Sequence, residues 1–485
     1  MQLSKSFLTK ALPSAWYYYG HELYQAQNDD LWHKINQYID VTVALDSRVI
    51  EAGEFFVALK GAKQDGHIFL EDVLQRGACG ALIAQDRIDL LRSMNPALVA
   101  EKLFIVVSDT RAAFIALAKA RRAELTCPVV GITGSVGKTT TKEMLRSILK
   151  EASMPAFVSF KNYNTDLGVC YNLLRVPAGV QAVVLEMGIN GQGEMLELAQ
   201  IVRPTFAVIT MIGHAHIGHL GGTIQGVAHE KKQIFSCFGP EGVGIINGDQ
   251  ALLADVHYSH PVARFGLKTK NHVQARKVHT VAAEAENTFN TFFTLKWYDQ
   301  KAFVQLKGHH GGSVNNALAA ATAAYFLQVP FDAVVRGLEK YESFENRFEM
   351  KKLKQDRGIL LSDCYNANPE NMKAALTAFA QLQTTGKKIV VLGEMFELGA
   401  RQDFWHRQVS RVLAKITDLY MLIAVGQRAA LYGKMISRGV HVHVVQDWQE
   451  ACHIFNAMQN TEKTIVLVKG GRSSRLENMV EQVAE

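Results

Sequence analysis

The segment PVVGITGSVGKTTTKEMLRSILK, from Pro128 to Lys150, decides the fold of the middle of this chain. An apolar strand, PVVGI, runs into a glycine-containing turn, and the helix KEMLRSILK follows at once. Glycines in such a turn let backbone N–H groups point at phosphate oxygens, and the helix N-terminus adds a favourable dipole. We therefore predict an ATP-binding loop, with a turn that binds nothing as the simpler alternative. Its predicted nucleotide-binding residues are Gly134, Ser135, Val136, Gly137, Lys138, Thr139 and Thr140.

Two side chains of this loop carry specific expectations. Lys138 is placed to neutralise the β- and γ-phosphates, and the hydroxyl of Thr139 is placed to bind Mg²⁺. Glu186 ends the later strand AVVLE. Because ligands of open α/β sheets bind outside the carboxyl ends of the strands, we expect Glu186 to hold a metal ion beside the loop.

A histidine-rich segment, MIGHAHIGH, follows the strand FAVIT. His214, His216 and His219 have the HxHxxH spacing of zinc hydrolases, so zinc chemistry is one interpretation. A zinc hydrolase has no use for a phosphate loop, however. One histidine beside phosphates and Mg²⁺ is therefore the preferred interpretation.

Strands and helices alternate along most of the chain, which predicts an α/β protein. At 485 residues, the chain is too long for one ordinary core. We predict three domains: a small α/β N-terminal domain, a central phosphate-loop domain with a parallel sheet, and a C-terminal Rossmann-like domain. Their predicted boundaries are 1–108, 109–345 and 346–485.

The composition excludes several classes of protein. The chain has 52 Lys and Arg against 46 Asp and Glu, a mild excess without a basic run, so no nucleic-acid partner is expected. No apolar run approaches the roughly 20 residues that span a bilayer, and the first residues lack the apolar core of a signal peptide. The six cysteines form no CxxC pair and are expected to be reduced. We therefore expect a cytoplasmic protein that does not insert into membranes.

Taken in this order, the motifs resemble the Mur ligase family over nearly the whole chain. The family's TGxxGKT[ST] loop matches Thr133 to Thr140, and its AH[LI] histidine matches His216. The helix GVAHEKKQIF fits a family segment whose lysine, here Lys231, is carbamylated. The resemblance implies ATP, two Mg²⁺ ions and the catalytic residues Lys138, Lys231 and His216. The metal ligands that we expect are Thr139, Glu186, His216 and Lys231.

Both ends of the chain resemble the branch of this family that adds D-alanyl-D-alanine to UDP-N-acetylmuramoyl-tripeptide. The motifs are DSR at Asp46–Arg48, DCYNANPENM at Asp363–Met372, LGEMFELG at Leu392–Gly399 and KGGR at Lys469–Arg472. The DNPR motif expected of the ligase for the third peptide residue is absent. The resemblance implies ATP binding by Asn316, Arg347, Asp363 and Asn366, and substrate binding by Ser47, Arg48, Lys469 and Arg472.

The implied reaction is ATP-dependent amide formation through an acyl phosphate, and a monomer suffices for it. Three positions depart from the family pattern, which usually has Asn, Glu and Ser where this chain has Met211, Gly218 and Gly471. Another Mur-type amino-acid ligase and a nucleotide-binding protein without catalysis therefore remain as alternatives, together with the zinc hydrolase.

Overall fold

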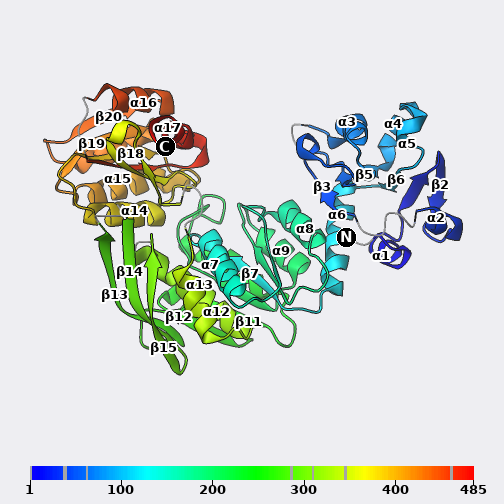
Figure 1. Cartoon of the computed structure of the whole chain (residues 1–485), viewed down its shortest axis with the longest axis horizontal. Helices are drawn as coiled ribbons and strands as arrows, with labels where there is room; N and C mark the ends of the chain where they lie inside the picture. Colours follow the sequence, from blue (N-terminus) through cyan, green and yellow to red (C-terminus); the bar gives the residue numbers. More distant parts are fainter. Residues whose placement is uncertain are drawn as a thin grey trace.

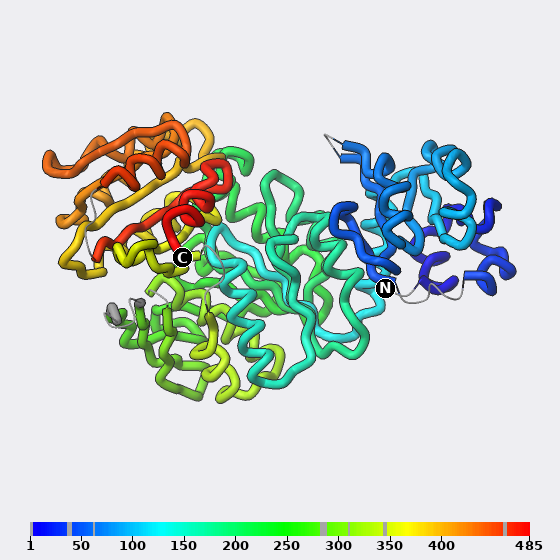
Figure 2. Tube along the Cα trace, turned by 45° about the horizontal axis from the view of Figure 1, so that its top comes forward, coloured from blue at the N-terminus to red at the C-terminus, as the bar shows by residue number. Residues whose placement is uncertain are grey.

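The computed structural model describes residues 3–35, 41–61, 64–283, 288–308, 311–342, 347–458 and 463–485. Three mixed or parallel sheets follow one another along the chain, and helices cover them, which confirms the predicted α/β class. The N-terminal and C-terminal parts lie at opposite ends of the middle part (Figures 1 and 2). The predicted boundary at residue 108 stays a prediction, and the one at residues 345 and 346 lies outside the described residues.

The first sheet has the order β2-β1-β6-β5-β4-β3, in which β3 to β6 are parallel and β1 and β2 form an antiparallel hairpin. The aromatic cluster WYYY becomes β1, and Tyr17 and Tyr18 in it are buried, so these two rings serve packing. The strands are β1 Trp16–Tyr19, β2 Glu22–Gln25, β3 Val43–Ala44, β4 Phe55–Val57, β5 Gly80–Ala84 and β6 Leu103–Val107. The helices are α1 Lys5–Ala11, α2 Asp29–Lys34, α3 Leu70–Gln75, α4 Ile88–Ser93, α5 Pro96–Val99 and α6 Thr110–Glu124.

The second sheet has nine strands in the order β15-β14-β13-β12-β11-β10-β7-β9-β8. Strands β7 to β12 are parallel to their neighbours, and β13 is parallel to β12. Strands β13, β14 and β15 pair antiparallel with one another, an extension that we did not predict. The strands are β7 Val129–Thr133, β8 Ala156–Val158, β9 Ala182–Glu186, β10 Phe206–Ile209, β11 Val243–Asn247, β12 Val262–Gly266, β13 Val273–Ala283, β14 Thr288–Trp297 and β15 Gln300–Lys307. The helices are α7 Lys138–Glu151, α8 Asp166–Leu174, α9 Glu194–Val202, α10 Ile224–Lys232, α11 Ala251–Ala254, α12 Val314–Phe326 and α13 Phe331–Glu339.

The third sheet has the order β16-β17-β21-β18-β19-β20 and is parallel except for its edge strand β16. The strands are β16 Glu349–Lys352, β17 Gly358–Asp363, β18 Lys388–Gly393, β19 Leu419–Val425, β20 His441–Val445 and β21 Thr464–Lys469. The helices are α14 Pro369–Gln381, α15 Gln402–Leu413, α16 Trp448–Ala457 and α17 Leu476–Val483.

Strand register explains how distant segments meet at one edge of the second sheet. Strand β7 lies between β9 and β10, with Ile132 opposite Glu186 and Thr133 opposite Ile209. The phosphate loop, Glu186 and the histidine segment therefore all leave the sheet at the carboxyl ends of adjacent parallel strands. Within the described ranges, no helix has both the length and the apolar character needed to cross a membrane.

Candidate functional site

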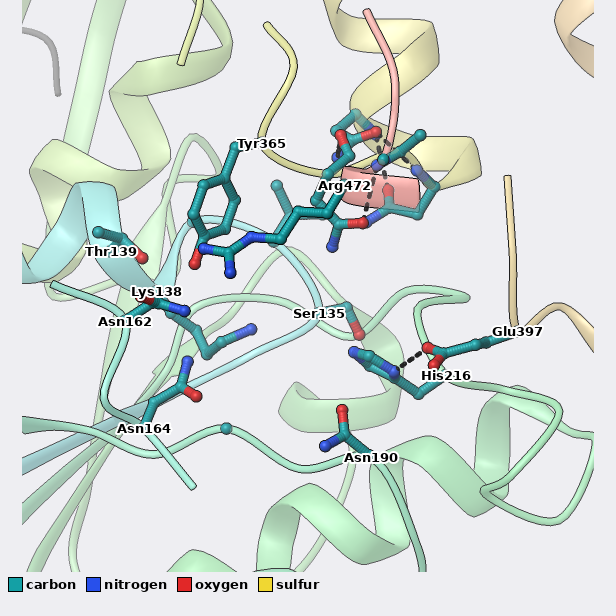
Figure 3. A pocket seen from close by; sticks show the side chains of 18 of the residues that line it. Ser135, Lys138, Thr139, Asn162, Asn164, Asn190, His216, Tyr365, Glu397 and Arg472 are labelled. Carbon is teal, nitrogen blue, oxygen red and sulfur yellow. Dashed lines mark hydrogen bonds and ion pairs between the residues drawn. The ribbon is translucent and has the colours of Figure 1, made fainter. Parts of the chain in front are cut away.

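A cavity of about 380 Å³ lies where the phosphate loop of the middle part faces loops of the C-terminal part. Its walls come from both parts, and Figure 3 shows Lys138 and Thr139 on one side with Tyr365 and Arg472 beyond them. Predicted site residues on its walls are Ser135, Val136, Gly137, Lys138, Thr139, Glu186, His216, Arg347, Asn366 and Arg472. The structure thus brings together residues from six separate segments of the chain.

Hydrogen bonds to the segment that follows β10 fix the conformation of the phosphate loop. The Ser135 hydroxyl donates to the carbonyl of Gly213 (3.0 Å) and accepts from its N–H (2.9 Å). The Thr210 hydroxyl donates to the carbonyl of Val136 (2.6 Å). Gly134 and Thr140 complete the loop without lining the cavity. The loop is therefore fixed before any nucleotide binds.

Gly137 is the residue on which the loop turns into helix α7. Its φ of +90° is left-handed, which glycine adopts at little cost. A Cβ at this position would lie 2.1 Å from the side-chain oxygen of Asn316. No side chain caps the first turn of α7, so its N–H groups are available to an anion. Asn316, predicted to bind ATP, therefore lies against the loop at Gly137 but does not line the cavity.

Thr139 and Glu186, two of the predicted metal ligands, are in direct contact. The Thr139 hydroxyl donates to Glu186 (2.7 Å) and accepts from the Arg347 guanidinium (2.8 Å). The side-chain amide of Asn164 donates to the other oxygen of Glu186 (2.8 Å). These hard oxygen atoms suit Mg²⁺, which also keeps water and phosphate oxygens as ligands.

Two lysines of the site differ in burial: Lys231 is buried, whereas Lys138 is partly buried and lines the cavity. Lys231 is 1% exposed, and burial, together with the charge of Lys138, lowers the pKa of its ammonium group well below the ordinary value. Burial also lowers the pKa of Lys138, whereas the nearby carboxylate of Glu186 raises it. Lys231 does not line the cavity itself. A buried lysine whose neutral form is favoured is a nucleophilic amine, as carbamylation requires.

The three histidines do not gather around one point. The Nδ1 atom of His214 lies beside the Glu370 carboxylate, that of His216 lies beside the Glu397 carboxylate, and His219 is exposed. Over the described part of the chain, no three His, Cys, Asp or Glu side chains are placed to hold a metal ion together. The zinc interpretation of HxHxxH is therefore not supported, and the histidine segment instead contacts the C-terminal part.

His216 and Glu397 face each other across the junction of the two parts (Figure 3). Both residues have left-handed backbones, with φ of 59° and 61°. Such strained conformations in non-glycine residues cluster at functional sites. Burial lowers the pKa of His216, opposed by the adjacent carboxylate of Glu397.

Two residues of the C-terminal part that we predicted for different ligands bind each other. Lys469, fully buried, donates to the carboxylate of Asp363 (2.6 Å) and to the carbonyl of Asn366 (3.1 Å). The parallel register of β17 and β21 places these two strand ends side by side. Neither Lys469 nor Asp363 lines the cavity, so this pair shapes the loop that carries Asn366.

A second cavity, of about 1230 Å³, lies between the first sheet and helix α8. Ser47 and Arg48, predicted to bind substrate, line it, and Arg48 forms an ion pair with Asp46 (2.7 Å). Asn162 and Asn164 line both cavities. The two cavities therefore share a wall.

Sequence reasoning missed several residues of the site, chiefly Asn162, Asn164, Tyr365 and Glu397. Asn162 and Asn164 lie in a loop before α8 that carries no recognisable phosphate or metal pattern. The other two stand inside quoted motifs, YNANP and ELG, beside residues that we did select. Their position within those motifs was the available signal.

Comparison with known proteins places these features in one family. The description "Mur ligase middle domain" matches residues 132–324, and "Mur ligase, glutamate ligase domain" matches residues 346–472. The UDP-N-acetylmuramoyl-tripeptide--D-alanyl-D-alanine ligase of Bacillus subtilis (strain 168) is 34% identical over 456 residues, which cover 91% of this chain and 93% of that protein. The ligase of the same name from Escherichia coli (strain K12) is 30% identical and covers 95% of this chain and 98% of its own. A crystal structure of MurF from Acinetobacter baumannii superimposes with a TM-score of 0.80 and 29% identity, covering 99% of this chain and 98% of that chain.

Proposed function

Since this chain belongs to the Mur ligase family, we propose that it joins D-alanyl-D-alanine to UDP-N-acetylmuramoyl-tripeptide at the expense of ATP. The reaction is a step in making the precursor of peptidoglycan. The observation that carries the proposal is the cavity between the phosphate loop and the C-terminal part, which shares a wall with a second, larger cavity.

ATP occupies the first cavity in this proposal. Its phosphates lie on the loop amides and the uncapped start of α7, and Lys138 and Arg347 offset their negative charge. Asn316 lies against the loop, and Asn366 reaches the cavity from the C-terminal part. We assign both asparagines to the nucleotide, because an amide offers a donor and an acceptor.

The UDP-linked substrate occupies the second cavity, with Ser47 and Arg48 at its wall. Its tripeptide must bring a carboxylate to the γ-phosphate in the first cavity. The shared wall at Asn162 and Asn164 is the route that joins the two spaces. We therefore assign the tripeptide to this passage.

D-alanyl-D-alanine approaches from the other side. A cavity of about 400 Å³ at the carboxyl ends of β18 to β20 shares Phe396 and Ser473 with the ATP cavity. Arg428 and Arg475 line it and suit the carboxylate of a dipeptide, and Glu394 suits its ammonium group.

Thr139, Glu186, His216 and, as a carbamate, Lys231 would hold magnesium, of which we propose two ions. Magnesium supplies charge neutralisation between two anionic reactants. The donor set fits, because a threonine hydroxyl and carboxylate oxygens are hard ligands. A carbamate on Lys231 would convert a buried amine into a further oxygen ligand.

The proposed reaction has two steps, formation of an acyl phosphate and formation of the amide. A carboxylate oxygen of the tripeptide attacks the γ-phosphorus, the bond to the β-phosphate oxygen breaks, and ADP leaves. The dipeptide amine attacks the acyl carbon, loses a proton, and inorganic phosphate leaves. Water would hydrolyse the acyl phosphate, so the walls from the C-terminal part must close over the cavity during turnover.

Every residue assigned here comes from one chain, so we propose that the enzyme acts as a monomer. Because ATP and the nucleotide-linked substrate are cytoplasmic compounds, we also propose a cytoplasmic location.

An assay of ADP release tests the proposal. Purified protein is given ATP, magnesium and UDP-N-acetylmuramoyl-tripeptide, with D-alanyl-D-alanine, with L-alanine, or with no amine. We expect sustained release only with D-alanyl-D-alanine. Equal release with L-alanine would indicate another amino-acid ligase, and no release in any arm would refute the assignment.

Two variants separate the roles of the lysines. Lys138→Ala should abolish ADP release, because its ammonium group lies in the cavity beside the loop. Lys231→Ala should also lose activity, but short carboxylic acids should restore part of it by replacing the carbamate. Unchanged turnover of Lys231→Ala, with no effect of added acid, would remove the carbamate from the mechanism.

A further inference from the structure

The ring of Tyr365 lies against two guanidinium groups in the ATP cavity. The Cζ atom of Arg347 is 3.9 Å from the centre of the ring, and that of Arg472 is 4.9 Å from it. Tyr365 follows strand β17, whereas Arg472 follows β21, and Arg347 precedes β16. One aromatic side chain therefore contacts two arginines that arrive from separate segments (Figure 3 shows Tyr365 with Arg472).

These arginines lack the partners that usually hold such side chains. Throughout the described ranges, neither Arg347 nor Arg472 forms an ion pair with a carboxylate. Arg347 donates from one terminal nitrogen to Thr139, and its Nε atom is buried without a hydrogen-bond partner. A buried donor without an acceptor is costly unless a ligand supplies one. The pair is therefore arranged to receive an anion from outside the protein.

We propose that Tyr365 is a positioning residue, which holds Arg347 and Arg472 together so that both guanidinium groups meet the phosphoryl group being transferred. This inference rests on the proposed ligase function and assigns a role to a residue that touches two phosphate-binding side chains. Arg347 reaches the loop side through Thr139, and Arg472 lines the cavity from the C-terminal side.

The chemistry explains why a ring serves better than a carboxylate here. A carboxylate partner would compete with phosphate for the guanidinium N–H groups, whereas the face of a ring leaves those N–H groups free. Ordering two long arginine side chains in advance also removes an entropy cost from nucleotide binding. The ring thus fixes both cations without neutralising them.

The experiment compares Tyr365→Phe with Tyr365→Leu. Phe keeps the aromatic face, so the affinity for a non-hydrolysable ATP analogue, measured by calorimetry without other substrates, should stay within about threefold of the wild type. Leu removes the face, and affinity should fall by about tenfold for each arginine that depends on the ring. In the ADP-release assay, Leu should also lower kcat, because arginine side chains stabilise the charge that develops in the transition state of phosphoryl transfer.

A double-mutant cycle shows whether Tyr365 acts through the arginines. In a background of Arg472→Met, the further change Tyr365→Leu should cost clearly less than it does in the wild type, because one contact is already gone. Full additivity with both Arg472→Met and Arg347→Met would overturn the proposal. So would equal affinities of the Phe and Leu variants.

Tyr420→Leu is the matched control for folding. Tyr420 lies in β19 of the same sheet, with the Lys387 ammonium 4.2 Å from its ring centre, and it does not line the cavity. This variant should bind the analogue as the wild type does, and thermal unfolding should show that all variants are folded. If the wild type binds the analogue but shows no ligase activity, the proposed function fails, while the comparison of affinities still decides the role of Tyr365.

Discussion

Replacing Gly137 by alanine perturbs the phosphate loop at its tightest point. The residue has φ of +90°, and the added Cβ would lie 2.1 Å from Oδ1 and 3.0 Å from Cγ of Asn316. A left-handed backbone costs an alanine about 1–2 kcal/mol. Ordinary contact needs well over 3 Å, so the Asn316 amide must also move by roughly 1 Å.

The two costs should appear in different measurements. The backbone cost falls on the free energy of unfolding, which should decrease by about 1–2 kcal/mol in urea. The displacement of Asn316 falls on nucleotide binding. Loss of a well-placed amide contact is worth about 1–3 kcal/mol, so the KM for ATP should rise by about 5-fold to 150-fold.

Gly179→Ala is the matched control, because Gly179 also has a left-handed φ, +79°, but nothing lies within 4 Å of an added Cβ. It should lose a similar free energy of unfolding and keep its KM for ATP in the ADP-release assay. The reasoning is refuted if Gly137→Ala keeps the KM for ATP within twofold while Gly179→Ala shows the expected loss of stability. It is equally refuted if both variants change the KM alike.

Two further predictions concern the connections between the parts, and a third concerns a buried histidine of the C-terminal part. Arg175→Ala removes an ion pair with Glu54 (3.1 Å) that joins the end of α8 to the first sheet and is mostly shielded from solvent. The KM for the UDP-linked substrate should rise by about tenfold, while the KM for ATP stays constant. His214→Ala removes a ring whose centre lies 4.0 Å from the centre of the Trp405 ring. The C-terminal part should then close less tightly over the cavity, so water can hydrolyse the acyl phosphate. Steady-state assays should therefore find more ADP than amide product. Burial lowers the pKa of His406, so the unfolded chain takes up this proton at a higher pH than the folded chain does. The free energy of unfolding should therefore fall as the pH drops below about 6.5, and His406→Gln should flatten that slope in urea titrations.

Much of the fold could be predicted because buried parallel strands are continuous apolar runs. Three such runs are VVGIT, AVVLE and KIVVLG, and each forms a strand as predicted. The antiparallel extension of β13 to β15 could not, since its strands carry polar and charged residues on an open face, as in QKAFVQLK. In such a segment, hydrogen bonding to the neighbouring strand decides the structure, and no local pattern reveals that neighbour.

The residues of the site also fall into two groups, those that a local motif predicts and those that only the folded sheet brings together. Residues tied to a local motif, such as Lys138 and Thr139, could be predicted because strand, turn and helix N-terminus are adjacent in the chain. Asn164 could not, because its contact with Glu186 joins two loops that only the sheet brings together. Lys469 was expected to bind substrate, but the register of β17 and β21 gives it a carboxylate partner first. Long-range pairing of this kind has no signature in the local sequence.

The contact between the middle and C-terminal parts explains why glycine stands at position 218, where the family usually has glutamate. A Cβ there would lie 2.8 Å from the backbone nitrogen of Gly399 and 3.0 Å from the carbonyl of Glu397, and one at Gly399 would lie 3.0 Å from the Gly218 Cα atom. The Gly218 N–H also donates to that Glu397 carbonyl (2.9 Å). The backbones approach so closely only because both residues are glycines, and this approach brings the Glu397 carboxylate to His216. A side chain at position 218 would hold the C-terminal part away from the histidine segment. The altered position therefore belongs to the contact between the two parts beside the cavity, and it does not indicate a decayed active site.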